Sequence, residues 1–210
     1  MDELVIRDGL YYKKFSDVPF TGKVDGQEQG LMKNGKRDGS WVEYHDNGEL
    51  RYKCNYKNGK AEGSYVQYYE NGQLWYESEH KNGEKDGSDV IYHENGELWY
   101  KGKYKNGKKV GSWVKYYEYG QLESKGDYKN GKKVGTWVEY FGHGVLKEKG
   151  NYKNDKRDGT WVYYHENGEL EYKSEFKNDK EEGYNISYNS DGTLDKGLTG
   201  TYKNGKKISD

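Results

Sequence analysis

The stretch YKNGKKVG occurs twice without a change, at Tyr104–Gly111 and at Tyr128–Gly135, 24 positions apart. Three further columns of the sequence keep the same spacing. They are a glycine column (Gly39, Gly63, Gly87, Gly111, Gly135, Gly159, Gly183), a valine or isoleucine column (Val42, Val66, Val90, Val114, Val138, Val162, Ile186) and a leucine column (Leu50, Leu74, Leu98, Leu122, Leu146, Leu170, Leu194). Copies that repeat without insertion predict an array of one structural module.

Each copy contains two short segments rich in Trp, Val and Tyr, and Asn-Gly closes each segment, as at Asn47-Gly48 and Asn58-Gly59. Asn-Gly between β-prone segments favours a two-residue type I′ turn, because both turn residues need a positive φ. A glycine-interrupted unit with no apolar run at helical spacing argues against helix. The sequence therefore predicts an all-β fold, an elongated single-layer antiparallel β-meander solenoid of 24-residue β-hairpin repeats.

A two-residue turn at Asn47-Gly48 also assigns faces, because directly paired residues share a face of the sheet. It pairs Trp41 with Cys54 and Tyr44 with Arg51. The predicted packing face carries Trp41, Glu43, His45, Leu50, Tyr52, Cys54 and Tyr56, and the other face carries Val42, Tyr44, Arg51, Lys53 and Asn55. Most copies place glycine at the position of Cys54, which leaves room for an indole. We therefore expect Cys54 to be a tolerated replacement rather than a reactive thiol.

The composition is polar, with 34% charged and 31% hydrophobic residues. Disorder is nevertheless disfavoured, because the net charge is only −1 and the chain has 24 Tyr and 6 Trp, which disordered chains usually lack. With a single cysteine, no internal disulfide can form. The start MDELVIRDGLYYKK does not resemble a signal peptide, and no apolar run reaches transmembrane length. We expect a soluble cytoplasmic protein.

The YKNGKxxG core of Tyr104–Gly111 and the WVxYYxNGxL half of Trp113–Leu122 resemble the MORN repeat family. They are more similar to its shorter bacterial variant, which occurs in YwqK-type antitoxins, and the resemblance covers about residues 29–207. It implies a twisted β-sheet that acts as a scaffold, as a protein-binding surface or as a phospholipid binder. The antitoxin relationship implies a partner protein that is neutralised.

The two ends of the chain depart from the repeat. We expect residues 1–28 to form an N-terminal β cap with a hairpin around Asp8-Gly9, followed by a strand led by Pro19, since proline suits a sheet edge. Residues 29–194 form the seven repeats, and residues 195–210 form a C-terminal capping strand and turn.

Histidines suggest a metal site, but the repeat argues against one. His45, His93 and His165 share a column, and one repeat advances about 10 Å along a sheet, so the first two should lie roughly 19 Å apart. Zinc ligands lie about 2 Å from the metal. His80 and His143 are interpreted as replacements of an aromatic residue and of a turn asparagine. We predict no metal and no cofactor.

The sequence also predicts no enzyme. Glu94 and Glu97 flank an exposed turn tip, and no Ser, His and Asp pattern marks a nucleophile. KNGKK is not a phosphate loop, because no helix follows it. A regular array lacks a deep apolar pocket.

One outward column differs between copies in a way that suggests binding. It runs Arg51, Trp75, Trp99, Glu123, Lys147 and Glu171, so only two copies place tryptophan there. Together with their predicted cross-strand partners, these form an aromatic cluster of Tyr68, Trp75, Tyr92 and Trp99 that resembles a protein-binding hot spot. The alternative is local packing that compensates for Asp89. This residue interrupts the anchor column, which consists of Trp41, Tyr65, Asp89, Trp113, Trp137, Trp161 and Asn185.

Lysine gathers in the turns at one long edge of the predicted sheet, and acid in those at the other. The lysines proposed to face an anion are Lys105, Lys108, Lys109, Lys129, Lys132 and Lys133. Solvated turns that keep the array soluble are the alternative. The leading interpretation is a non-catalytic scaffold or binding module for an unknown protein partner, antitoxin-like in character, and the second is association with anionic lipid headgroups. Nucleic acid is not expected, since the chain is not basic overall. Self-association through a sheet edge or face stays open.

Overall fold

The computed structural model describes residues 4–210, which contain no helix and fall into two compact units. Unit 1 comprises the chain up to Leu98 with Tyr104–Lys108, and unit 2 comprises Trp99–Lys103 with Lys109–Asp210. Up to Lys105 the strands are β1 (Leu4–Arg7), β2 (Leu10–Lys13), β3 (Gly22–Val24), β4 (Glu28–Lys33), β5 (Lys36–Tyr44), β6 (Leu50–Lys57), β7 (Lys60–Tyr68), β8 (Leu74–Lys81), β9 (Glu84–Tyr92) and β10 (Leu98–Lys105). Strand β10 has residues in both units, and so has the next strand, whose first residue Lys108 belongs to unit 1.

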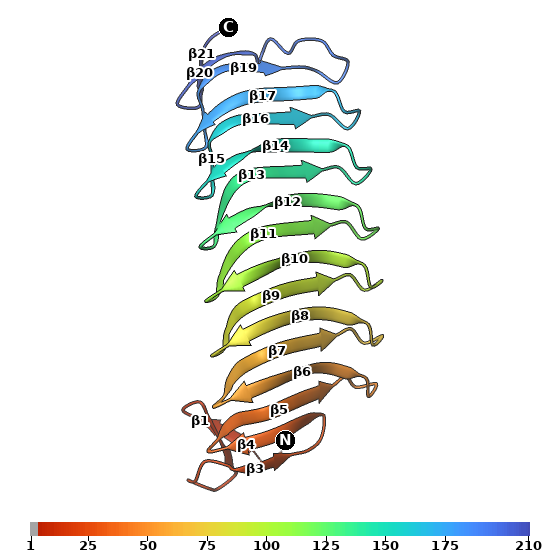
Figure 1. The fold of residues 1–210 in the computed structure, drawn as a ribbon, viewed down its shortest axis with the longest axis vertical. Helices are drawn as coiled ribbons and strands as arrows, with labels where there is room; N and C mark the ends of the chain where they lie inside the picture. Colours follow the sequence, from red (N-terminus) through yellow and green to blue (C-terminus); the bar gives the residue numbers. More distant parts are fainter. Residues whose placement is uncertain (1–3) are drawn as a thin grey trace. The chain divides into compact units, whose positions relative to one another are not determined.

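Unit 2 continues the hairpin pattern. Its strands are β11 (Lys108–Tyr116), β12 (Leu122–Lys129), β13 (Lys132–Tyr140), β14 (Leu146–Lys153), β15 (Lys156–Arg157), β16 (Gly159–Tyr164), β17 (Leu170–Lys177), β18 (Lys180–Glu181), β19 (Gly183–Ser187), β20 (Gly200–Lys203) and β21 (Lys206–Ser209). From β3 to β9 and from β11 to β14 the strands pair antiparallel in chain order (Figure 1). The short β15 and β16 both pair with β14, β16 also pairs with β17, and β1 and β2 form a separate two-stranded sheet. This confirms the all-β meander of 24-residue hairpins.

The two turns of a repeat differ from each other. Asn58 and Gly59 both have positive φ (53° and 80°), and Lys57 pairs with Lys60, which confirms the predicted two-residue turn. At Asn47-Gly48 only the glycine has a positive φ (88°), and the amide of Gly48 donates to the carbonyl of His45 at 2.9 Å. This is a three-residue loop, a type I turn followed by a left-handed glycine. The predicted two-residue turn at Asn47-Gly48 is therefore wrong.

A β-bulge next to this loop restores the register. Trp41 pairs with Cys54 as predicted, but Tyr44 pairs with Leu50, and Arg51 is the extra residue. A bulge re-aims the side chain of its extra residue. The Arg51 guanidinium lies 2.5 Å from the Glu43 carboxylate, on the packing face, whereas Leu50 shares the face of Tyr44. The predicted faces of Leu50 and Arg51 are thus exchanged.

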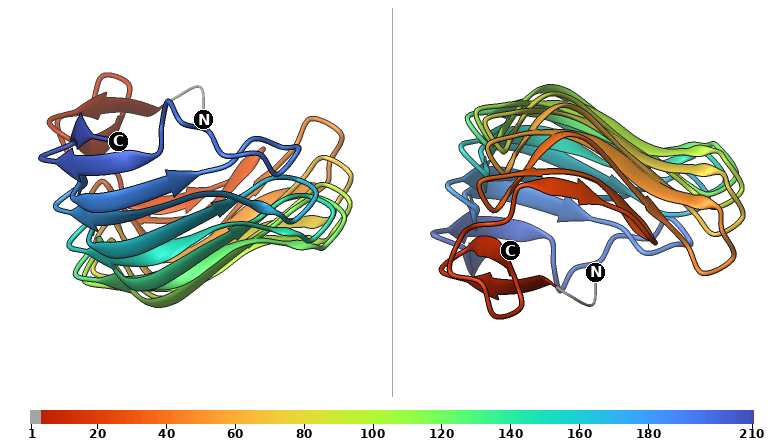
Figure 2. Two further views of the ribbon diagram at one scale, coloured as in Figure 1. Left: turned by 90° about the horizontal axis from the view of Figure 1, so that it is seen from above. Right: turned by 90° about the horizontal axis from the view of Figure 1, so that it is seen from below.

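A second bulge lies on the other strand of each repeat. Between β6 and β7 the register jumps from Cys54–Tyr65 to Tyr56–Ala61, and Gly63 in the jump has a φ of 80°. Side chains other than glycine rarely adopt this conformation, which explains the glycine column of the sequence. Figure 2, with views from above and from below, shows strands that bend along their length.

Each buried indole lies directly on a glycine of the preceding hairpin. A Cβ built on Gly150 would lie 2.1 Å from the Trp161 ring, and one on Gly126 equally close to Trp137. The Trp161 indole Nε1 donates to the carbonyl of Asn151 at 3.1 Å, and this hydrogen bond holds the ring against the backbone of the neighbouring strand. Trp161 is 1% exposed as a result. Glycine and tryptophan 11 residues apart therefore form one packing unit.

The N-terminal segment covers the first hairpin of unit 1. Asp8 and Gly9 form the predicted turn between β1 and β2, with φ of 49° and 74°. Pro19 bridges to Tyr12 rather than leading β3. Leu4, Tyr11 and Phe20 pack against the buried cluster of Val24, Met32 and Trp41. This segment therefore packs against the buried cluster of the first hairpin, and residues 1–3 of the predicted cap lie outside the described residues.

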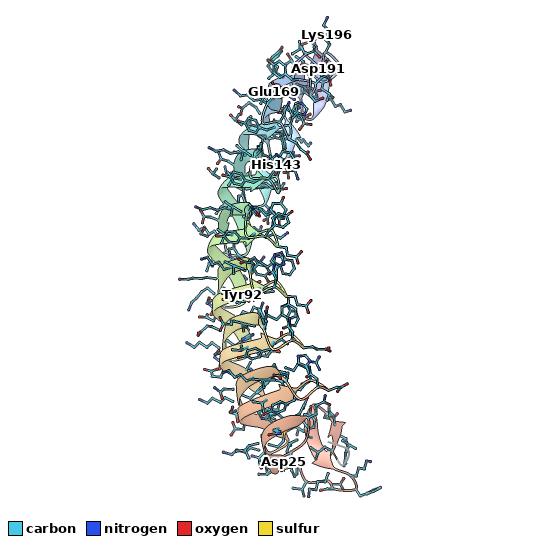
Figure 3. The ribbon with its side chains drawn as sticks, turned by 90° about the vertical axis from the view of Figure 1, so that its right-hand side faces the viewer. Asp25, Tyr92, His143, Glu169, Asp191 and Lys196 are labelled. Carbon is cyan, nitrogen blue, oxygen red and sulfur yellow. The ribbon has the colours of Figure 1, made fainter. Side chains whose placement is uncertain are left out.

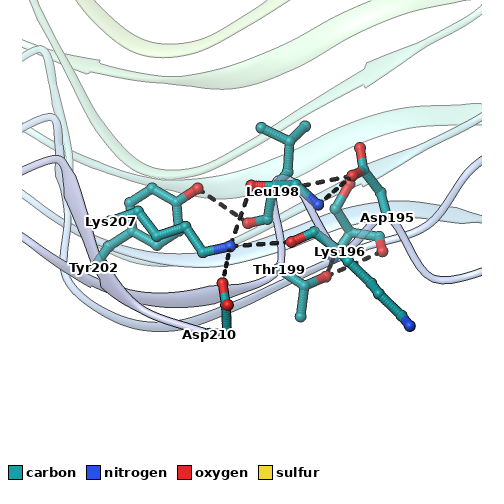
Figure 4. Close-up of polar contacts among 9 residues, drawn as sticks. Asp195, Lys196, Leu198, Thr199, Tyr202, Lys207 and Asp210 are labelled. Atoms are coloured by element: carbon teal, nitrogen blue, oxygen red, sulfur yellow. Dashed lines mark hydrogen bonds and ion pairs between the residues drawn. The ribbon is translucent and has the colours of Figure 1, made fainter.

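At the C-terminus the chain folds over β19 with a polar loop (Figure 4). The Lys207 ammonium binds the carbonyls of Lys196 and Gly197 at 3.0 and 3.2 Å, and the Asp210 carboxylate at 2.7 Å. Asp195 accepts the amides of Gly197 and Leu198. Polar groups of this C-terminal region thus form hydrogen bonds and an ion pair with one another.

The glycine–indole contact generates a stability prediction. We expect Gly150→Ala to lower the free energy of unfolding by about 3 kcal/mol, because the new methyl group must push Trp161 off the strand. Adding Trp161→Tyr, which copies the natural Cys54–Tyr65 combination, should recover part of the loss. Urea denaturation followed by tryptophan fluorescence measures both. Cys54→Ala is the control within the same column, and a Gly150→Ala variant as stable as the parent chain would contradict the contact.

Candidate binding face

The packing face, which carries Trp41 and its equivalents, also carries a column of cations that the sequence analysis missed. Arg37, Lys85, Lys109, Lys133 and Arg157 recur every 24 residues or a multiple of it. The Lys109 ammonium lies 4.1 Å from the centroid of the Trp113 ring, and the Lys133 ammonium lies 4.2 Å from that of Trp137. Cations over indole rings are attracted to the ring face. The face is therefore aromatic and positively charged.

In unit 1 this face contains a buried ionic cluster where Asp89 replaces the anchor tryptophan. Asp89 is 0% exposed, and its Oδ1 accepts from Lys85 at 2.8 Å and from the Tyr76 hydroxyl at 2.7 Å. Burial lowers the pKa of Lys85, but the hydrogen bonds to Asp89 and Tyr76 outweigh it and raise that pKa. Burial and the Lys85 charge lower the pKa of His80. The ion pair replaces the indole at this position.

Beside this cluster lies a shallow hollow of about 430 Å³. Tyr65, Trp75, Tyr76, His80 and Lys85 form most of its walls. The Trp75 ring stands 5.8 Å from that of Tyr69, and its side chain is 37% exposed. Unit 1 therefore presents one solvent-facing indole at the rim of the hollow.

Unit 2 has a groove of about 280 Å³ on its packing face. It is lined by Trp99, Tyr100, Lys109, Trp113, Val114, Lys115, Ser124, Tyr128 and Trp137. The Lys115 ammonium lies 6.0 Å over the Trp99 ring and 2.6 Å from the Glu123 carboxylate. Trp99 is 36% exposed. Five aromatic rings thus converge on one groove within unit 2.

The predicted aromatic cluster is not arranged as expected. Tyr68 pairs with Leu74, not with Trp75, because of the bulge. Trp75 and Trp99 lie on the packing face, as their contacts with Tyr69 and Tyr100 show. By strand alternation Tyr68 and Tyr92 lie on the opposite face, where Tyr92 has its pKa raised by burial and by Glu77. The prediction of a shared surface on the polar face is wrong for the tryptophans.

The six predicted anion-facing lysines have different surroundings. In unit 1 Lys105 pairs with Asp86 at 3.0 Å and Lys108 is exposed. In unit 2 Lys109 and Lys133 lie over indoles, whereas Lys129 and Lys132 are exposed. Carboxylates also belong to this edge, and accept backbone amides of the adjacent turn, as Asp86 does from Asn106. The edge is less basic than the lysine pattern indicated.

Three of the histidines, His45, His143 and His165, have structural partners at the opposite edge, onto which Figure 3 looks. A ring nitrogen of His45 lies 3.0 Å from the carbonyl of Tyr68, and one of His165 lies 2.9 Å from that of Tyr188. His143, labelled in Figure 3, contacts the carbonyl of Glu166 at 2.8 Å. Asn47, which has the equivalent position in the first repeat, contacts the carbonyl of Glu70 in the same way. The histidines therefore join neighbouring hairpins, as tyrosine and asparagine do elsewhere.

The described residues offer little reactive chemistry. Burial raises the pKa of the Cys54 thiol to about 11, which disfavours the thiolate. Among residues 4–210, no three His, Cys, Asp or Glu side chains are grouped so that they could hold a metal ion. The same residues include no helix with the length and apolarity needed to cross a membrane.

Hairpins of constant length, turn chemistry and anchor contacts define a β-hairpin repeat protein. The model of the family described as MORN repeat variant matches residues 37–58, 61–82, 85–106, 109–130, 133–154 and 157–178, more than half of the sequence. The chain therefore belongs to the MORN repeat variant family. Its members are generally non-catalytic binding modules. A search of curated protein sequences finds no match.

Glu148 gives a pH-dependent prediction for this face. It replaces tyrosine in the column of Tyr100, and burial together with Glu139 raises its pKa. A carboxyl whose pKa is raised by folding stabilises the fold while protonated, and this contribution is lost as pH rises through the folded pKa. Glu148→Gln should therefore be more stable than the parent at pH 7. The advantage should vanish below about pH 4, under the ordinary glutamate pKa.

Thermal denaturation of both chains between pH 3 and 8 measures this difference. Glu97→Gln at an exposed turn is the control and should show no such trend. If the stability advantage of Glu148→Gln stays constant across the pH range, ionisation of the Glu148 carboxyl is not its cause.

Proposed function

We propose that the chain is a non-catalytic binding module whose exposed tryptophans on the packing face contact a protein partner. The observation that carries the proposal is their exposure. Trp75 and Trp99 are 37% and 36% exposed, whereas Trp41, Trp113 and Trp161 are 0%, 6% and 1% exposed. Tryptophan is enriched among the residues that dominate protein interfaces.

The position of these tryptophans also supports binding over packing. The bulge residue of the other copies is Arg51, Glu123, Lys147 or Glu171, so the fold does not require an aromatic residue there. Arg51, Glu123 and Lys147 use the position for an ion pair across the hairpin. An indole at this site adds exposed apolar surface that the other copies do not have.

The tryptophans can be tested separately from stability. We expect Trp75→Ser and Trp99→Ser each to weaken partner binding at least about 30-fold, as a hot-spot residue worth about 2 kcal/mol does. The melting temperature should change by less than about 3 °C, since exposed side chains contribute little packing. The partner is first isolated by affinity capture with the parent chain, and its affinity is then measured by calorimetry.

Tyr184→Ser is a matched control, because Tyr184 is an exposed aromatic residue outside both hollows (60%). It should retain the partner. If the tryptophan variants melt much earlier and still bind, the packing alternative is correct.

An antitoxin-like inhibitory role is the finer form of this proposal, and it rests on the resemblance alone. The neighbouring gene provides its test. If that gene encodes a toxin, co-expression with the parent chain should restore growth, and co-expression with Trp75→Ser or Trp99→Ser should not. Growth arrest in the presence of the parent chain would contradict the inhibitory role.

Association with anionic lipid is the second proposal from the sequence, and its electrostatic basis is modest. Four of the six lysines are exposed, and one of them, Lys105, is paired with Asp86. The other three are Lys108, Lys129 and Lys132, and each is worth about 1 kcal/mol near an anionic surface. We expect binding to phosphatidylserine vesicles at low salt only, with loss by about 150 mM NaCl because of screening. Vesicle sedimentation tests this, and the control is a variant in which Lys108, Lys129 and Lys132 are all replaced by Glu.

A further inference from the structure

In unit 2 the packing face has a gap at a position that other copies fill with a ring. The column runs Tyr52, Tyr76, Tyr100, Ser124, Glu148 and Tyr172. Where tyrosine is present, it contacts the residue 13 positions later. The ring of Tyr100 packs on Trp113 and that of Tyr52 on Tyr65, both at 5.7 Å. The hydroxyls of Tyr76 and Tyr172 form hydrogen bonds at the same position of their repeats. Ser124 brings no ring to Trp137, and the 280 Å³ groove lies at this point.

We propose that this groove accepts one aromatic side chain of a protein partner, flanked by acidic residues, in the place of the missing tyrosine ring. The inference rests on the proposed protein-binding function and names the chemistry of the partner. Trp137 is half-buried, in contrast to Trp161 with 1% exposure, so part of its indole is open to a ligand. Aromatic rings gain specific contact energy in such pairs.

The size of the groove favours a single side chain. Pockets for drug-sized molecules measure about 300–1,000 Å³ and are enclosed, whereas this groove is smaller and open along the sheet. Its walls already present rings at the distances used within the fold, since Trp137 lies 5.2 Å from Tyr128 in an edge-to-face arrangement. A ring that enters the groove would take the place that Tyr100 and Tyr52 occupy in their own repeats.

Charge at the groove selects the flanking residues. Lys109 and Lys115 line it, and its described lining contains no carboxylate. Two carboxylates lie beside the groove, and each is paired with a lysine: Glu123 with Lys115, and Glu139, the cross-strand partner of Ser124, with Lys147. Lys133 adds a positive charge above Trp137. The hollow at the end of unit 2 is different, because Arg157 and Lys180 are mixed there with Glu171, Asp179 and Glu181. Acidic flanks therefore complement the groove at Ser124.

The test uses a defined heptapeptide with tyrosine at its centre and three Asp or Glu residues on each side. The full chain is labelled with ¹⁵N, and the six tryptophan indole signals are followed as the peptide is added. We expect saturable shifts of the Trp99, Trp113 and Trp137 signals, and none for Trp41 and Trp161. Peptides with serine for tyrosine, or with lysine for the acids, should bind at least about ten-fold more weakly.

The deciding variant is Ser124→Tyr, which restores the ring found in four other copies. It should fold with equal or higher thermal stability and lose at least about ten-fold in peptide affinity, equal to about 1.4 kcal/mol. Ser124→Ala keeps the gap and should bind like the parent. Ser112→Tyr places the same ring on the exposed opposite face of unit 2 and should also bind like the parent.

Each outcome separates the two proposals. Unchanged peptide binding by Ser124→Tyr, or no saturable binding by the parent chain, overturns the inference about the groove. If the captured partner is lost by Trp75→Ser and Trp99→Ser but kept by Ser124→Tyr, the binding function stands and the groove is not its site. Loss in Ser124→Tyr but not in Ser112→Tyr supports the groove.

Discussion

Contact between an indole and the backbone of the preceding hairpin is the constraint on which each unit depends. The indole occupies the space of a side chain on the neighbouring strand, so that strand must offer glycine. Trp161 on Gly150 shows the geometry, with the ring 2.1 Å from the position of an absent Cβ. The sequence obeys this coupling throughout, in the pairs Gly30–Trp41, Cys54–Tyr65, Ser78–Asp89, Gly102–Trp113, Gly126–Trp137, Gly150–Trp161 and Ser174–Asn185. Wherever tryptophan is absent, the glycine is absent too.

This coupling explains how a chain with few aliphatic residues folds. The Trp41 and Trp161 indoles each bury a large apolar area at low conformational cost, and their Nε1 atoms donate to the carbonyls of Leu31 and Asn151 at 3.0 and 3.1 Å. Two of the exceptions, Asn185 and Asp89, are buried polar residues that form hydrogen bonds with neighbouring side chains. Asn185 accepts from Ser174 and donates to Tyr172, both at 2.7 Å, and Asp89 pairs with Lys85. Anchor positions therefore tolerate chemistry that an aliphatic core would not.

Most of the fold followed from the repeat and its turns, because each hairpin is a local structure of consecutive strands. The register at Trp41 and the turn at Asn58-Gly59 needed only the sequence. The loop at Asn47-Gly48 did not, since Asn-Gly is compatible with a two-residue turn and with a three-residue loop, and the compensating bulge at Arg51 leaves the distant register unchanged. That error moved Trp75 and Trp99 to the wrong face. The cations over the rings were visible as a column, but only the structure shows that they turn inward from the edge.

The residues that hold the anchor rings in place differ from the residue that leaves the groove open. Trp137 is fixed from below by Gly126, from the side by Tyr128 and Tyr152, and from above by Lys133. None of these contacts involves residue 124. The column of Tyr100, Ser124 and Glu148 can therefore vary while the hairpins stay in register, whereas the glycine and tryptophan columns can change only together. In a repeat protein of this kind, the ligand-binding surface can change through substitutions in the column of Tyr100, Ser124 and Glu148 without disturbing the scaffold. The groove of unit 2 lies at Ser124, in this column.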